Sequence, residues 1–115
     1  IRDFIHSQDV AKGMMLVVEK GVTEPVNLGS GIGYSIKDVV GIIIKNLDEK
    51  PEVIWDTNKP MGDKKRLMNI ERAESIGFKL SVPLEDGIKM TMKWYKNNKD
   101  IANKRFNVFY EKKLA

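Results

Sequence analysis

A glycine-rich turn, Gly29–Gly33 (G-S-G-I-G), is the first feature of this 115-residue chain that suggests ligand chemistry. It follows a predicted strand and precedes a predicted helix, which is where a dinucleotide fingerprint places the pyrophosphate of its cofactor. That fingerprint requires a third glycine where this sequence has Tyr34, and the helix starts only at Ser35. We therefore favour a tight turn that needs positive φ. A cofactor's pyrophosphate, or contact with another ligand, is the alternative.

Other reactive side chains are better explained by structure. Tyr95 and Lys99 match the Tyr-x-x-x-Lys acid/base pair of short-chain dehydrogenases, but they end a predicted helix in a charged stretch. We predict a core tyrosine beside surface lysines. His6 lies in a short apolar segment and is predicted to be a packed histidine rather than a base. Five carboxylates are predicted to be helix caps or solvated side chains: Asp38, Asp48, Glu49, Glu85 and Asp86.

The charge pattern favours a small anionic ligand over nucleic acid as the partner. The formal net charge is +4, which suits an anionic ligand such as a phosphate. Four basic residues fall in one predicted loop, between Lys59 and Arg66. They do not form the clustered basic face expected of a nucleic-acid-binding protein, so we expect no nucleic-acid partner.

Composition excludes further classes. Cysteine is absent and His6 is the single histidine, so we predict neither a disulfide nor a metal site. No apolar run approaches the roughly 18 residues of a membrane span. The first residues lack the pattern of a signal peptide. We therefore expect a cytoplasmic protein with no membrane partner.

Hydrophobic periodicity predicts an α/β chain of short strands among four or five helices. The predicted strands are Phe4–Ser7, Pro25–Leu28, Glu52–Asp56 and Leu67–Ile70. The predicted helices are Val10–Val18, Val39–Leu47, Glu71–Ile76, Pro83–Tyr95 and an amphipathic tail at 100–115.

Helix ends are marked by local signals. Asp9 is predicted to be the N-cap of the first helix, and Gly21 to end it. Ser35 and Asp38 form a capping-box pattern before the second helix. Pro83 is predicted to lie in the first turn of the fourth.

Four segments carry a resemblance to a known family. They are Arg2–Ala11 (R-D-F-I-H-S-Q-D-V-A), Asn27–Gly31 (N-L-G-S-G), Lys59–Ile70 (K-P-M-G-D-K-K-R-L-M-N-I) and Ile76–Tyr95. Their order and spacing resemble extended short-chain dehydrogenase/reductases, the nucleotide-sugar epimerases and dehydratases. The third segment is similar to a pattern of GDP-L-fucose synthases.

The resemblance implies the C-terminal part of such an enzyme. Residues 1–99 would be its nucleotide-sugar-binding portion, and 100–115 a basic amphipathic tail. The N-terminal Rossmann half would carry the cofactor loop and the catalytic Tyr and Lys, and would be the missing partner. NAD or NADP is implied for the complete enzyme and no cofactor for this chain alone, so we expect the chain to have no catalytic residue and no activity of its own.

The resemblance also implies a substrate site. Arg2 and Arg66 match positions where the family places basic contacts to the nucleotide diphosphate of a GDP- or UDP-sugar. Two guanidinium groups suit a pyrophosphate because each makes paired hydrogen bonds. Lys65 and Lys59 are weaker candidates.

Other interpretations remain open. A free-standing, non-catalytic module for nucleotide-sugars or phosphates is one alternative. A basic protein-interaction domain is another. We also expect homo-oligomers, or marginal stability as a monomer, because the missing half would normally cover apolar surface of this chain.

Overall fold

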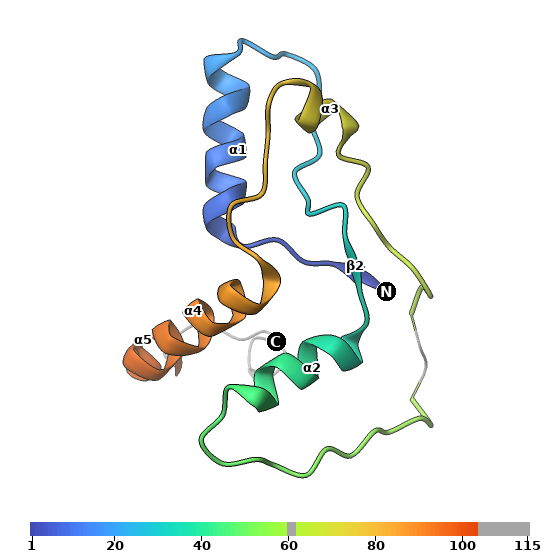
Figure 1. Ribbon diagram of the computed structural model, residues 1–115, viewed down its shortest axis with the longest axis vertical. Helices are drawn as coiled ribbons and strands as arrows, with labels where there is room; N and C mark the ends of the chain where they lie inside the picture. The colour runs from blue at the N-terminus through green and yellow to red at the C-terminus, as the bar shows by residue number, and fades with distance from the viewer. Residues whose placement is uncertain (60–61, 104–115) are drawn as a thin grey trace, which may run out of the picture.

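The computed structural model describes residues 1–59 and 62–103, which form helices at two ends with short strands between them (Figure 1). The elements are β1 (Arg2–Asp3), α1 (Ser7–Glu19), β2 (Gly33–Tyr34), α2 (Ile36–Lys45), α3 (Glu71–Ser75), α4 (Leu84–Asn97) and α5 (Lys99–Asn103). In Figure 1, α1 and α3 lie at the upper end, and α2, α4 and α5 at the lower end. This mixture of helices with a small sheet agrees with a partial α/β domain.

The sheet is centred on β1. Arg2 pairs with Tyr34 and Asp3 pairs with Gly33 in an antiparallel ladder between β1 and β2. On its other side, Arg2 forms an isolated parallel bridge with Arg66. β1 therefore has a neighbour on both sides, and one neighbour is Arg66, the last of the four basic residues between Lys59 and Arg66.

The strand predictions are mostly wrong. The strand predicted at Phe4–Ser7 lies earlier, at Arg2–Asp3, because Ser7 already begins α1. The predictions at Pro25–Leu28, Glu52–Asp56 and Leu67–Ile70 are wrong, since these residues are not in strands. β-propensity alone makes no strand; a segment needs a ladder partner as well.

The helix predictions fare better, but the first cap was misassigned. α1 begins at Ser7, so Asp9 is its third residue and not its N-cap. The N-cap is His6, whose Nδ1 accepts a hydrogen bond from the Gln8 amide at 3.3 Å. His6 is half-buried, and its role is capping as well as packing. Gly21, at φ 62°, follows the end of α1 as predicted.

The capping box before α2 is confirmed. Ser35 Oγ accepts from the Asp38 amide at 3.0 Å, and Asp38 Oδ2 accepts from the Ser35 amide at 2.9 Å. The hydrogen bonds from Ser35 lower the pKa of Asp38. α3 matches its prediction to within one residue, and Pro83 is the N-cap of α4 rather than part of its first turn.

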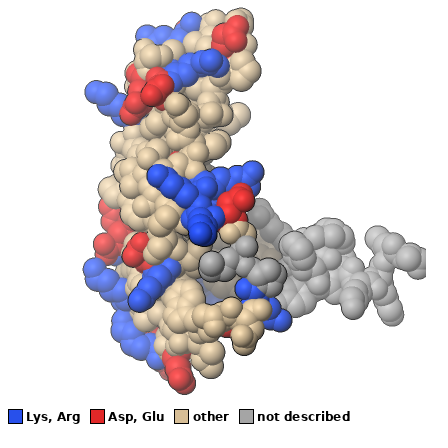
Figure 2. Space-filling model, turned by 90° about the vertical axis from the view of Figure 1, so that its right-hand side faces the viewer, with Lys and Arg blue, Asp and Glu red and all other residues tan. Residues whose placement is uncertain are grey.

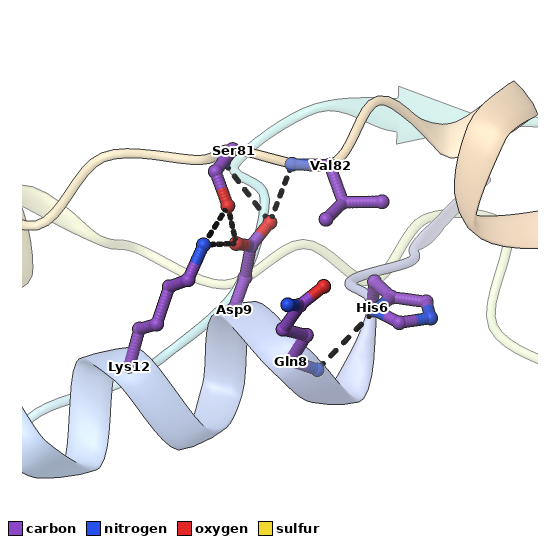
Figure 3. Close-up of polar contacts among 6 residues, drawn as sticks. All are labelled: His6, Gln8, Asp9, Lys12, Ser81 and Val82. Carbon is purple, nitrogen blue, oxygen red and sulfur yellow. Dashed lines mark hydrogen bonds and ion pairs between the residues drawn. The ribbon is translucent and has the colours of Figure 1, made fainter.

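A buried carboxylate joins the start of α1 to the segment that enters α4 (Figure 3). Asp9 is 0% exposed. It accepts hydrogen bonds from the Ser81 amide at 3.1 Å, the Val82 amide at 2.9 Å and the Ser81 hydroxyl. Lys12 Nζ lies 3.9 Å from its Oδ1. Burial raises the pKa of Asp9, but these hydrogen bonds outweigh burial and lower it overall.

Apolar packing is sparse. Among the described apolar side chains, Ala73 and Phe78 are the ones buried. Tyr95 is 48% exposed, so the prediction of a core tyrosine is wrong. α4 ends at Asn97 and α5 starts at Lys99, so Tyr95 and Lys99 do not share one continuous helix.

Two further predictions can be placed against the described residues. Most of the predicted tail, residues 104–115, lies outside them. Within 1–59 and 62–103, no helix has both the length and the apolar character needed to cross a membrane.

Candidate functional site

The carboxylate of Asp3 holds together three segments that meet at β1. It accepts from the Ser30 amide at 2.8 Å, the Ser30 hydroxyl at 2.5 Å, the Gly31 amide at 3.0 Å and the Met68 amide at 3.3 Å. Burial raises the pKa of Asp3, and the four hydrogen bonds lower it by more. Asp3 therefore stays ionised and connects β1 to the glycine-rich turn and to the segment after Arg66.

The glycine-rich turn is shaped by this carboxylate. Gly31 has φ 67°, which confirms the predicted positive φ at that position. A Cβ on Gly29 would lie 2.7 Å from Met68 Cβ and 2.8 Å from Asp3 Oδ2, so only glycine allows this approach. Because Asp3 already accepts from the Ser30 and Gly31 amides, these donors do not fit a cofactor's pyrophosphate.

Arg2 lies on the opposite face of β1 from Asp3, because successive residues of a strand point to opposite faces. Residues paired across a ladder share a face, so Tyr34 and Arg66 lie on the same face as Arg2. We call these three residues the Tyr-Arg-Arg row. The structure thus brings together the two arginines that the sequence places 64 residues apart.

The two arginines are held differently. Arg2 Nη1 donates to the carbonyl of Asp63 at 2.7 Å and to that of Ile1 at 2.8 Å, so Arg2 also holds the backbone at Asp63. The backbone of Arg66 is fixed by its amide, which donates to the Ile1 carbonyl at 3.0 Å. The Arg66 side chain is exposed, and its guanidinium makes no hydrogen bond or ion pair to the described residues. The described residues thus leave this guanidinium available for an anion.

Neither candidate lysine is a ladder or bridge partner of Arg2. Lys65, next to Arg66, lines a groove of about 800 Å³ that also contains Met68 and Phe78. Lys59 is exposed. Figure 2 shows Lys and Arg side chains gathered near mid-height on the face of the 62–70 segment.

Two residues of this site were missed in the sequence. Asp3 appeared only as part of a motif, although an acidic residue beside a candidate arginine is a signal for a structural acceptor. Tyr34 had no signal of its own, because its position beside Arg2 follows only from the register of β1 and β2. Within the described ranges, no three His, Asp or Glu side chains gather as ligands for a metal ion.

Sequence comparison relates the chain to enzymes of nucleotide-linked sugars. It is 31% identical over 99 residues to an Arabidopsis thaliana protein provisionally named GDP-L-fucose synthase 2, covering 85% of this chain and 30% of that protein. It is 30% identical over 105 residues to the dTDP-D-glucose 4,6-dehydratase of Mus musculus, covering 84% and 30%. No family model matches the chain.

A bacterial relative is also an enzyme of nucleotide-linked sugars. The GDP-L-fucose synthase of Escherichia coli (strain K12) is 28% identical over 110 residues, covering 87% of this chain and 34% of that enzyme. The chain spans about a third of the length of the curated relatives it matches. These matches confirm the resemblance to the extended short-chain dehydrogenase/reductases. The chain is a relative of the GDP-L-fucose synthases and of related epimerases and dehydratases.

Proposed function

We propose that this chain is the nucleotide-sugar-binding part of an epimerase or reductase similar to GDP-L-fucose synthases, with the diphosphate bound between Arg2 and Arg66. The observation that carries the proposal is the parallel bridge between these two residues. This bridge places side by side two arginines from the first and the third of the segments that resemble the family. The names of the relatives, which refer to GDP- and dTDP-linked sugars, support the ligand class.

The geometry suits a diphosphate. Neighbouring strands lie about 4.8 Å apart, so two arginines on paired positions present their forks to adjacent phosphates. The contact between Arg2 and the Asp63 carbonyl positions its guanidinium before any ligand arrives. Each charge-assisted contact contributes roughly 1.5–3 kcal/mol.

The oxidation and reduction of the sugar belong to the remainder of the complete enzyme in this proposal. NAD or NADP would be held there, together with the catalytic Tyr and Lys. Residues 1–99 would bind and orient the nucleotide end of the substrate. The chain alone is therefore proposed to bind without turnover.

Calorimetric titration of the 115-residue chain with GDP tests the site. Arg66→Ala is expected to weaken binding about ten- to hundredfold. Arg66→Lys should recover only part of the loss, because an ammonium lacks the planar fork. Lys64→Ala, which removes a neighbouring exposed charge, is the matched control and should change affinity by no more than about fivefold. Equal effects of Arg66→Ala and Lys64→Ala would refute the diphosphate site.

A further inference from the structure

We propose that Tyr34 is a specificity-determining residue that stacks on the base of the nucleotide whose diphosphate lies on the two arginines. The inference rests on the proposed function and adds the recognition of the nucleoside. Its basis is the register of the sheet, which sets Tyr34 next to Arg2 on the side away from Arg66. The three residues form one row on one face.

The backbone of Tyr34 is held on both sides. Gly33 pairs with Asp3, whose carboxylate is itself held by four hydrogen bonds. Ser35 is the N-cap of α2 and is held in its capping box. A side chain presented from such a backbone is positioned before the ligand binds, which reduces the entropy lost on binding.

The length of the row matches a nucleoside diphosphate. Tyr34 and Arg66 are separated by two strand spacings, or about 10 Å. This is comparable with the distance from the base to the terminal phosphate in an extended nucleoside diphosphate. A base on the Tyr34 ring would therefore leave the phosphates at Arg2 and Arg66.

Tyr34 is better placed for this role than Phe4, the aromatic residue that directly follows β1. Phe4, two residues after Arg2, lines an apolar cavity of about 280 Å³ together with Ile43 and Ile88. Its ring is thus used in packing between β1 and the lower helices. Tyr34 is half-buried, so part of its side chain reaches the surface, and an aromatic ring there suits a planar base.

The test compares two ligands on the same chain, GDP and inorganic pyrophosphate, by calorimetric titration. Tyr34→Leu is expected to weaken GDP binding about tenfold and to leave pyrophosphate binding unchanged. Tyr34→Trp and Tyr34→Phe should keep GDP binding, because each retains a ring. Tyr95→Leu removes an exposed tyrosine from α4 and is the matched control, expected to change neither affinity.

The outcomes separate this inference from the proposed function. If Tyr34→Leu weakens GDP and pyrophosphate equally, or neither, the stacking role is wrong while the diphosphate site stands. Arg66→Ala should weaken both ligands. If the unaltered chain binds neither ligand, both proposals are overturned. Circular dichroism spectra of the variants show whether each remains folded. If Tyr34→Leu does not fold, the test relies on Tyr34→Trp and Tyr34→Phe, which retain a ring.

Discussion

Asp3 and Asp9 lie six residues apart, and they use the same chemistry to different ends. Each carboxylate accepts backbone amides and a serine hydroxyl from a segment distant in sequence. Hydrogen bonds lower the pKa of both against the opposing effect of burial. Asp9 is closed off completely, on a helix face packed against the 81–82 segment (Figure 3). Asp3 is only half-buried, and the other face of its strand carries Arg2.

The difference shows how this chain combines stability with an open surface. In a helix, a residue that points inward has its neighbours three and four residues away on the same, inward face. In a strand, a residue held inward forces its neighbour outward. Asp3 therefore stabilises the sheet and at the same time directs Arg2 to the opposite face of β1. Asp9 only stabilises the contact between α1 and the 81–82 segment. Because so few of the described apolar side chains are buried, we expect both carboxylates to contribute a large part of the stability of the fold.

Removal of each carboxylate should show this difference most strongly. Asp9→Ala leaves the Ser81 and Val82 amides without acceptors in a closed environment and should lower the free energy of unfolding by about 3 kcal/mol. Asp3→Ala should cost less, about 2 kcal/mol, because water can reach its partners. Urea titration followed by circular dichroism measures both. Glu24→Ala, at an exposed position, is the control and should stay within about 0.5 kcal/mol. Equal losses from the two aspartates would remove the distinction.

The pH dependence of stability offers a milder test of the same pair. Both aspartates have folded-state pKa values below the reference value of 3.8, so their contribution is present above about pH 4 and is lost as the pH falls further. Asp9→Asn and Asp3→Asn should each flatten the acid limb of unfolding free energy against pH. A residual slope should persist, because the pKa values of Asp38 and Glu85 are also lowered. Unfolding titrations across pH 3–6 would measure it, and an unchanged acid limb in both variants would contradict this assignment.

Local signals explain why the helices were predictable. The capping box of Ser35 and Asp38 and the glycines Gly21 and Gly77 act within a few residues, so a single sequence contains the information. The error at the start of α1 has the same local origin. Aspartate is favoured both at the N-cap and in the first turn. Asp9 lies in the first turn, as the third residue of α1, while His6 caps the helix.

The sheet and half of the site depend on contacts between distant residues. A parallel bridge between Arg2 and Arg66 leaves no periodicity in the sequence, and only the resemblance of two segments to a family singled out both arginines. The register of the strands determines which side chains share a face, and sequence motifs do not contain this information. It places Arg66 beside Arg2, whereas Lys65 lines the groove. It also places Tyr34 beside Arg2 and so adds Tyr34 to the site. The strand predicted at Glu52–Asp56 failed for the same reason, since its β-prone residues lack a ladder neighbour.

The smallest effect on folding is expected at the outer face of α1, the opposite extreme from Asp9 on the same helix. Met14 and Met15 are each 61% exposed and Val18 is 76% exposed, at a spacing that forms one apolar stripe. Because Met15 and Val18 are largely exposed, the double variant Met15→Glu with Val18→Glu should change the free energy of unfolding by less than about 0.5 kcal/mol. Exposed apolar stripes favour association, so we expect the unaltered chain to self-associate and this variant to be monomeric in sedimentation velocity runs.

A matched variant shows whether the α1 stripe itself is responsible. Ile54→Glu changes an apolar side chain that is 84% exposed and lies far along the sequence from α1, and it should leave self-association in place. If both variants dissociate the oligomer, the association is non-specific. If the unaltered chain sediments as a monomer at high concentration, the stripe makes no contact between copies. In either case Asp9 would remain essential to the inner face of α1, because its hydrogen bonds to Ser81 and Val82 lie within one chain.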